Sequence, residues 1–249
     1  MKSSIIKPAA AAVIIVAAMI GILHLKLNAS IRQNRISAAA SALSETTESG
    51  LVRLEIKLPT PVFNGTKEPI RINNLRKLSI GERPQFLAPI GTTNIAYRKP
   101  IASSDDNPII GEIEMVTDGD KEAADGSYVE LGPLQQHVTI DLSAIHEIYA
   151  VILWHYHKLP RVYFDVVVQV ADDRDFITNV RTLFNNDIDS SAGFGIGTDM
   201  HYIETYEGEL IDCLSKGIKA RFVRLYSNGN SVNDLNHYIE VEVYGKPAE

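Results

Sequence analysis

Short apolar stretches that alternate with polar residues recur along the chain, and this pattern most constrains the fold. Every second residue is apolar in 137–142 (HVTIDL), and 163–171, 220–227 and 238–245 repeat the pattern. A period of two places alternate side chains on one face of a β-strand. The segment 147–156 (EIYAVILWHY) is longer, almost continuously apolar and rich in β-branched residues. We therefore expect a succession of β-strands.

The alternation also predicts which side chains share a strand face. The residues grouped in this way are Val138, Ile140 and Leu142; Phe164, Val166, Val168 and Val170; Val223 and Leu225; and Ile239, Val241 and Val243. Clusters of turn-forming residues separate the strands, at 117–120, 171–175, 190–197 and 227–234. Many short strands joined by turns predict an all-β sandwich or jelly roll. The acidic residues Asp172, Asp173 and Asp175 then fall in a hairpin turn.

The N-terminus predicts a membrane segment. Residues 8–25 form an almost uninterrupted apolar run, which is at the lower limit for a helix that spans a bilayer. Lysines precede the run, and Lys26, Arg32 and Arg35 follow it, which favours an uncleaved anchor. A secretory signal peptide, cleaved near the small residues 38–42, is the alternative.

Composition divides the rest of the chain. Residues 1–27 are the predicted signal anchor, and the Ser/Ala-rich segment 28–50 is a stalk. Prolines recur through 51–92 and exclude a long helix, so we expect an extended arm that packs on the main domain. Residues 93–249 form the β-domain.

The charge of the chain restricts its partners. The formal net charge is −7, although basic residues outnumber acidic ones in 1–50, so the remainder is more acidic than the whole. An acidic domain repels phosphate backbones, and nucleic acid is therefore not expected as a partner. Cys213 is the only cysteine, which excludes an intrachain disulfide.

Six segments, in order and at fitting spacing, resemble the discoidin family (coagulation factor 5/8 type C domains, galactose-binding-like). They are NIAYRKPIASS (94–104), TDGD (117–120), HVTIDLSAIHEIYAVIL (137–153), VVQVADDRDF (167–176), ARFVRLY (220–226) and IEVEVYG (239–245). The resemblance implies a discoidin-type jelly-roll β-sandwich. The family's usual tryptophan after the Asp-Gly loop is missing, with Tyr128 near that place, and the disulfide of animal members is absent. Because that disulfide is absent, the chain looks like a microbial, membrane-anchored form. The insert 185–218 is long for the family, so ligand assignments there are not carried over.

The resemblance also implies a structural calcium site between the Asp-Gly loop and the final strand. By position, the side chains would be those of Asp118 and Glu240, and the backbone carbonyls those of Met115, Asp120, Ala123 and Ile239. The family often has a hydroxyl residue where Ala123 stands. The chemistry is reasonable, because calcium takes six to eight oxygen ligands and a glycine lets the loop fold around the ion. A plain Asp-Gly turn without metal is the alternative.

Partners of this family bind loops at one end of the sandwich, and two segments carry chemistry suited to a sugar. Aromatic rings and rigid polar groups are what a pyranose site needs. The candidate ligand-binding residues are Trp154, His155, His157, Arg224, Asn228, Asn230, Asn233 and His237. The alternatives are that Trp154 belongs to the core and that the asparagines serve the turn. His155 and His157, two apart, would share a strand face, and a transition-metal pair is a further alternative.

We therefore expect a non-catalytic module that binds carbohydrate on the cell envelope, held by its N-terminal helix with the β-domain outside the cytoplasm. Because the charges that flank the helix are nearly balanced, this orientation follows from the resemblance. Secretion after signal cleavage is the alternative location. A protein-adhesion or structural module is the alternative function, because one fold serves many roles. A metal-dependent hydrolase built on His155, His157 and Asp165 is a third hypothesis, but no complete ligand set is visible.

Overall fold

The computed structural model describes residues 50–62, 69–78 and 83–248. The predicted membrane segment, and the stalk except for Gly50, lie outside these residues. None of the helices among the described residues has the length and apolar character needed to cross a membrane.

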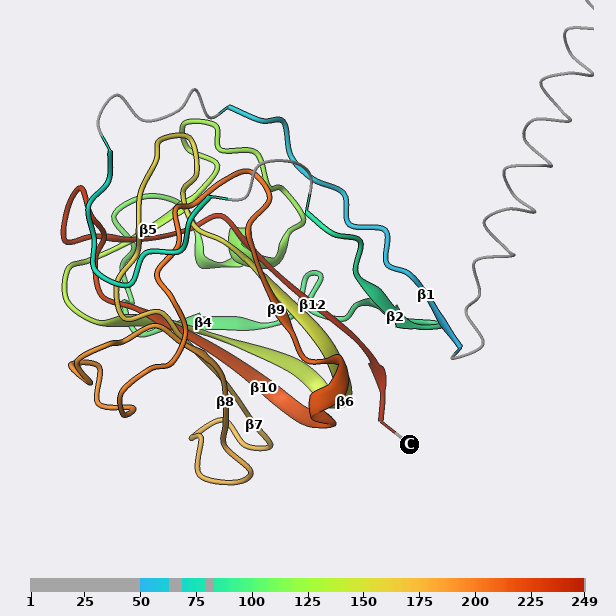
Figure 1. Ribbon diagram of the computed structural model, residues 1–249. Helices are drawn as coiled ribbons and strands as arrows, with labels where there is room; N and C mark the ends of the chain where they lie inside the picture. The colour runs from blue at the N-terminus through green and yellow to red at the C-terminus, as the bar shows by residue number, and fades with distance from the viewer. Residues whose placement is uncertain (1–49, 63–68, 79–82, 249) are drawn as a thin grey trace, which may run out of the picture. The chain divides into compact units, whose positions relative to one another are not determined.

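The regular secondary structure of the described chain is almost entirely β-strand (Figure 1). The strands are β1 (Leu51–Arg53), β2 (Leu87–Pro89), β3 (Thr93–Asn94), β4 (Ile101–Ser103), β5 (Val129–Leu131), β6 (Gln136–Trp154), β7 (Val167–Ala171), β8 (Arg181–Asn185), β9 (Glu209–Asp212), β10 (Ile218–Ser227), β11 (Asn236–Tyr238) and β12 (Glu240–Pro247). Two short 3-10 helices, η1 (Ile113–Thr117) and η2 (Leu214–Lys216), complete the described elements. The prediction of an all-β chain is confirmed at this level.

The main sheet has eight antiparallel strands organised around β6. Its order is β3-β12-β6-β10-β7-β8, and β4 and β9 also pair with β6. The first half of β6 pairs with β4 and β10, whereas Ala150–Leu153 pair with β9 and β12. Between the halves, Ser143 has a φ of 73° and the register with β10 shifts. The two strands expected at 137–142 and 147–156 are therefore one bent strand.

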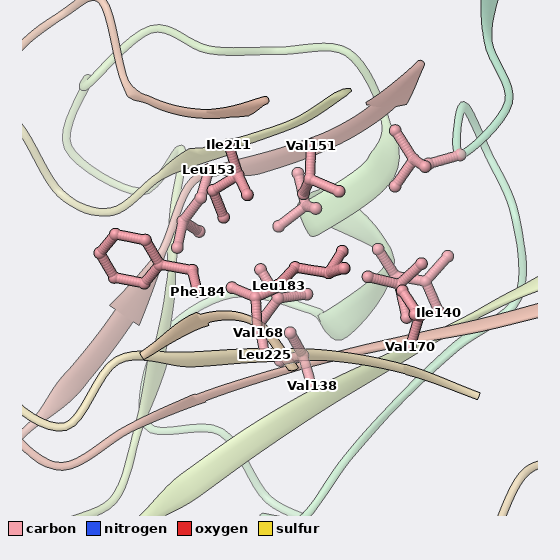
Figure 2. Close-up of a cluster of buried hydrophobic side chains, with 14 of the residues drawn as sticks. Val138, Ile140, Val151, Leu153, Val168, Val170, Leu183, Phe184, Ile211 and Leu225 are labelled. Atoms are coloured by element: carbon pink, nitrogen blue, oxygen red, sulfur yellow. The ribbon is translucent and has the colours of Figure 1, made fainter. Parts of the chain in front are cut away.

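The bend of β6 lets the two halves of the sheet face each other across one core. Val151, Leu153 and Ile211 point toward Val138 and Val168 from the opposite layer (Figure 2). All five are buried in the same apolar cluster. Each such side chain contributes about 1.5–3 kcal/mol on burial. The arrangement is consistent with the predicted β-sandwich.

A second apolar cluster covers the outer face of the same end of β6. Ala150, Ile152 and Trp154 are fully buried here, and Leu54 and Phe86 of the 51–92 segment pack against this cluster. The segment is tied down by hydrogen bonds, including one from the Thr60 N–H to Glu122 Oε1 (3.1 Å). Because both faces of 150–154 are covered, this part of β6 is apolar without alternation.

The apolar side chains predicted to share strand faces lie in the main apolar cluster, except at two positions. Val166, Val168, Val170, Val223, Leu225, Val241 and Val243 all lie in the main cluster. Ile239 instead packs in the second cluster, because the expected strand 238–245 is broken at this residue between β11 and β12. Phe164 is only half-buried and contacts the ring of His201 (centroids 5.8 Å apart).

Candidate functional site

Trp154 belongs to the core, as the alternative interpretation has it. Its side chain is fully buried, and the indole Nε1 donates to the carbonyl of Tyr206 (3.0 Å). Gly208 lies against the ring so closely that an added Cβ would be 2.7 Å from it. The ammonium of Lys121 lies 5.3 Å from the ring centroid. The indole therefore holds the 206–208 segment in place and presents no face to solvent.

His155 and His157 are both fully buried and have different partners. The His155 ring stacks on Tyr163 (centroids 4.1 Å apart), and its Nδ1 lies 2.6 Å from Glu204 Oε1. His157 Nε2 lies 3.0 Å from the carbonyl oxygen of Lys121. The expectation that the two rings share a strand face is wrong, because β6 ends at Trp154. They do not form a common metal or hydrolase site with Asp165, which accepts a hydrogen bond from Asn228 (2.9 Å).

The amide side chains of 228–236 hold their own loop together. Asn230 Nδ2 donates to Asn233 Oδ1 (2.6 Å) and to the carbonyl of Leu235 (2.8 Å), while its Oδ1 accepts from the Val232 N–H (2.9 Å). Asn230 is 6% exposed. These bonds use both amide groups of Asn230 inside the loop, which is the turn role that was the alternative for this asparagine, whereas Asn233 is exposed.

His237 is the centre of a buried hydrogen-bonded chain. Its Nδ1 lies 2.9 Å from the Tyr163 hydroxyl, and its Nε2 lies 2.9 Å from Glu130 Oε2. Burial, followed by the charge of Arg161, lowers the pKa of His237 to about 3. The ring is therefore neutral near pH 7, with Nε2–H donating to Glu130 and Nδ1 accepting from Tyr163. Fixed in this way, it orients the β5–β11 end of the sandwich.

Arg224 lies apart from the other candidate residues. Its Nε donates to Thr139 Oγ1 (2.7 Å), and its Nη2 donates to the carbonyl of Arg174 (2.8 Å). The guanidinium carbon lies 4.0 Å from the centroid of the Phe176 ring. The structure thus does not bring Trp154, His157, Arg224 and Asn230 into one solvent-open cleft.

The Asp-Gly loop and the start of β12 do meet, as a cation site there would require. The Gly119 N–H donates to Glu240 Oε2 (3.1 Å), and Asp118 Oδ1 accepts from the Asp120 N–H (2.8 Å). Glu240 is fully buried, and its Oε1 has no hydrogen-bond partner. Burial raises the pKa of this carboxyl to about 9. A buried carboxylate oxygen without a donor suits a hard cation, so these residues fit calcium. Met115, Ala123 and Ile239 lie close by in sequence, and of these Ala123 and Ile239 are buried.

A different acidic group lies where the long insert meets Asp165. Among the described residues, Asp165, Asp187 and Asp189 are the three whose carboxylate oxygens approach within 4.8 Å of one another. Asp187 is buried, and it accepts from the Ser191 N–H (3.1 Å) and the Ala192 N–H (2.9 Å). These bonds tie the insert to itself.

A cavity of ligand size lies where no candidate residue was placed. It has a volume of about 500 Å³ and is lined by Pro61 and by residues 76–78, 83–84 and 202–210. Volumes of about 300–1,000 Å³ are usual for ligand pockets. Its walls combine the rings of Tyr202 and Tyr206 with the apolar side chains of Leu78 and Leu210.

An ion pair forms the polar part of this cavity. Arg76 Nη1 donates to Glu209 Oε1 (2.9 Å), and Nη2 donates to Oε2, so the pair is two-pronged. Glu209 is 6% exposed, and burial raises the pKa of its carboxyl although Arg76 opposes the shift. Arg83 Nη1 donates to the carbonyls of Glu207 (3.0 Å) and Gly208 (3.3 Å). No local sequence signal marks these arginines, because their partners are more than 100 residues away along the chain.

Comparisons with known proteins give structural neighbours only. No protein-family model and no curated protein matches the chain. Among solved structures, it is similar to the CBM32 of AlyQ in complex with 4,5-unsaturated mannuronic acid (TM-score 0.41, 17% identity, covering 59% of this chain and 95% of that chain). It is also similar to a Streptococcus pneumoniae fucose binding module, SpX-3 (TM-score 0.42, 20% identity, 61% and 97%). A family 89 glycoside hydrolase from Clostridium perfringens matches with a TM-score of 0.43 and 19% identity over 62% of this chain, which is only 15% of that enzyme.

Proposed function

We propose that the chain is a non-catalytic carbohydrate-binding module whose ligand occupies the cavity beside Arg76 and Glu209. The observation that carries the proposal is a ligand-sized cavity that combines a rigid two-pronged ion pair with tyrosine rings and apolar walls. Sugars present hydroxyl groups and flat apolar faces, and such walls match both. His155, His157 and Asp165 have separate partners, which favours binding over hydrolysis.

Two further parts of the proposal lie outside the cavity. Calcium, held by Asp118 and Glu240 with nearby backbone carbonyls, would tie the Asp-Gly loop to β12 in a discoidin-type jelly roll. The N-terminal segment 1–27 would tether the domain to the cell envelope, outside the cytoplasm; the apolar run 8–25 supports this.

Binding to a broad glycan array tests the proposal, with Leu78→Trp as the diagnostic variant. Leu78 is 49% exposed at the cavity wall, so an indole there fills space without removing a hydrogen bond. We expect the wild-type chain to bind a sugar and Leu78→Trp to lose that binding. Ile90→Trp is the control, because Ile90 is 60% exposed in the same segment but does not line the cavity.

A chain that binds no sugar on the array would overturn the proposal. Capture of an envelope protein without any sugar would then support the adhesion alternative. If Leu78→Trp binds the sugar no less tightly than the control Ile90→Trp, the cavity is not the binding site.

A further inference from the structure

A second cavity adjoins the first along β9. It has a volume of about 300 Å³ and is lined by Met200 and Lys216, among others. Arg76, Glu209 and Leu210 line both cavities. The Arg76–Glu209 pair is thus the boundary between two adjacent hollows, each of ligand size.

The boundary has hydrogen-bonding capacity left over. A guanidinium carries five N–H donors, and the contacts of Arg76 with Glu209 use two of them. The Arg76 side chain is 49% exposed, whereas that of Glu209 is 8% exposed. Because the carboxylate holds the guanidinium in one plane, its remaining donors are fixed at the junction of the cavities.

The extended strand β9 lines both cavities. Apart from Glu204, the charged residues that line them are balanced in sign. Glu209 and Leu210 of β9 line the first cavity, and all four residues of the strand line the second. A straight strand suits a ligand that is itself extended. Apart from the Arg76–Glu209 pair and the buried Glu204, the charged lining residues are Lys77, Arg83 and Lys216 against Glu207, Asp199 and Asp212. Such a surface favours a neutral ligand over a polyanion.

We propose that the two cavities are adjacent subsites for a neutral oligosaccharide chain, with Arg76 donating to the ligand at the junction between sugar rings. This inference rests on the proposed function and goes beyond it, because a site for one terminal sugar would need only the first cavity.

Titration calorimetry on the full chain tests chain-length dependence. The probes are matched mono- and tetrasaccharides of the glucose, galactose and N-acetylglucosamine series. We expect the tetrasaccharide of the preferred series to bind at least about tenfold more tightly than its monosaccharide. Met200→Trp, which fills the second cavity from a side chain that is 41% exposed, should bind the monosaccharide normally and lose the tenfold gain. Ile196→Trp, in the same loop but outside the lining, should retain it.

The outcomes separate the two proposals. Binding of mono- and tetrasaccharide with equal affinity would overturn the second subsite and leave the carbohydrate-binding function standing. A full tetrasaccharide gain in Met200→Trp would do the same. Absence of binding to every probe and to the glycan array would remove both proposals.

Discussion

Arg76 and Glu209 are separated by 133 residues in the chain, yet they form a two-pronged ion pair between the N-terminal arm and β9. The pair fixes the 69–78 segment beside the edge of the sandwich, where Asn74 also donates to the carbonyl of Asp199 (3.1 Å). The same contact that anchors the arm therefore builds the wall of the proposed binding site.

Replacing Arg76 with methionine should destabilise the domain in a pH-dependent way. The change leaves the buried Glu209 carboxylate without its partner, at a cost of about 1–3 kcal/mol. Burial already raises the pKa of Glu209, and loss of Arg76 removes the main opposing effect. A carboxyl with a raised pKa in the folded state binds its proton more readily there than in the unfolded state. The loss in free energy of unfolding caused by Arg76→Met is therefore complete above that folded-state pKa and becomes smaller as the pH falls toward 5.

Urea unfolding of wild type and Arg76→Met at pH 8 and pH 5 measures this effect. Arg76→Met/Glu209→Gln is the control, and its deficit should not depend on pH in this way. An Arg76→Met deficit that is the same at both pH values would show that the Glu209 carboxylate is not the cause.

Calcium should raise the melting temperature of the metal-free protein. Glu240 Oε1 is buried without a partner, and a bound cation would supply the missing interaction. Stabilisation follows mass action, about 2.7 kcal/mol at a calcium concentration one hundred times the Kd. Thermal unfolding of the metal-free chain with and without calcium is the measurement. Glu240→Gln should abolish the shift; a wild-type protein that responds to neither calcium nor EDTA would refute the site.

Gly208→Ala should destabilise the domain more than Gly217→Ala. Both glycines have positive φ (68° and 57°), so alanine costs roughly 1 kcal/mol at either position. At Gly208 the new Cβ also meets the Trp154 ring at 2.7 Å, whereas at Gly217 nothing lies within 4 Å. Overpacking adds about 1–3 kcal/mol. Urea unfolding compares the two variants. Equal losses in free energy of unfolding would mean that the Trp154 ring moves away from the new Cβ without destabilising the domain.

The alternation of apolar residues was enough to predict strands and most of their buried faces. Val168, Val170, Val223 and Leu225 lie in the core as expected, because the period of a strand is a local property that each segment carries by itself. The continuous apolar run before Trp154 likewise predicted a strand, although not that a second segment covers its other face. The bend at Ser143 had no comparable signal.

Only the tertiary structure decided the candidate site. Trp154, His155 and Asn230 have the composition of a sugar site, but all three are buried, and they bond to Tyr206, Glu204 and Leu235 inside the protein. Arg76 and Glu209 have no local pattern, because an ion pair between distant segments depends on how those segments pack and not on spacing along the chain. Local periodicity determined the strands of this protein. Long-range packing decided which polar groups form hydrogen bonds inside the protein and which line a cavity.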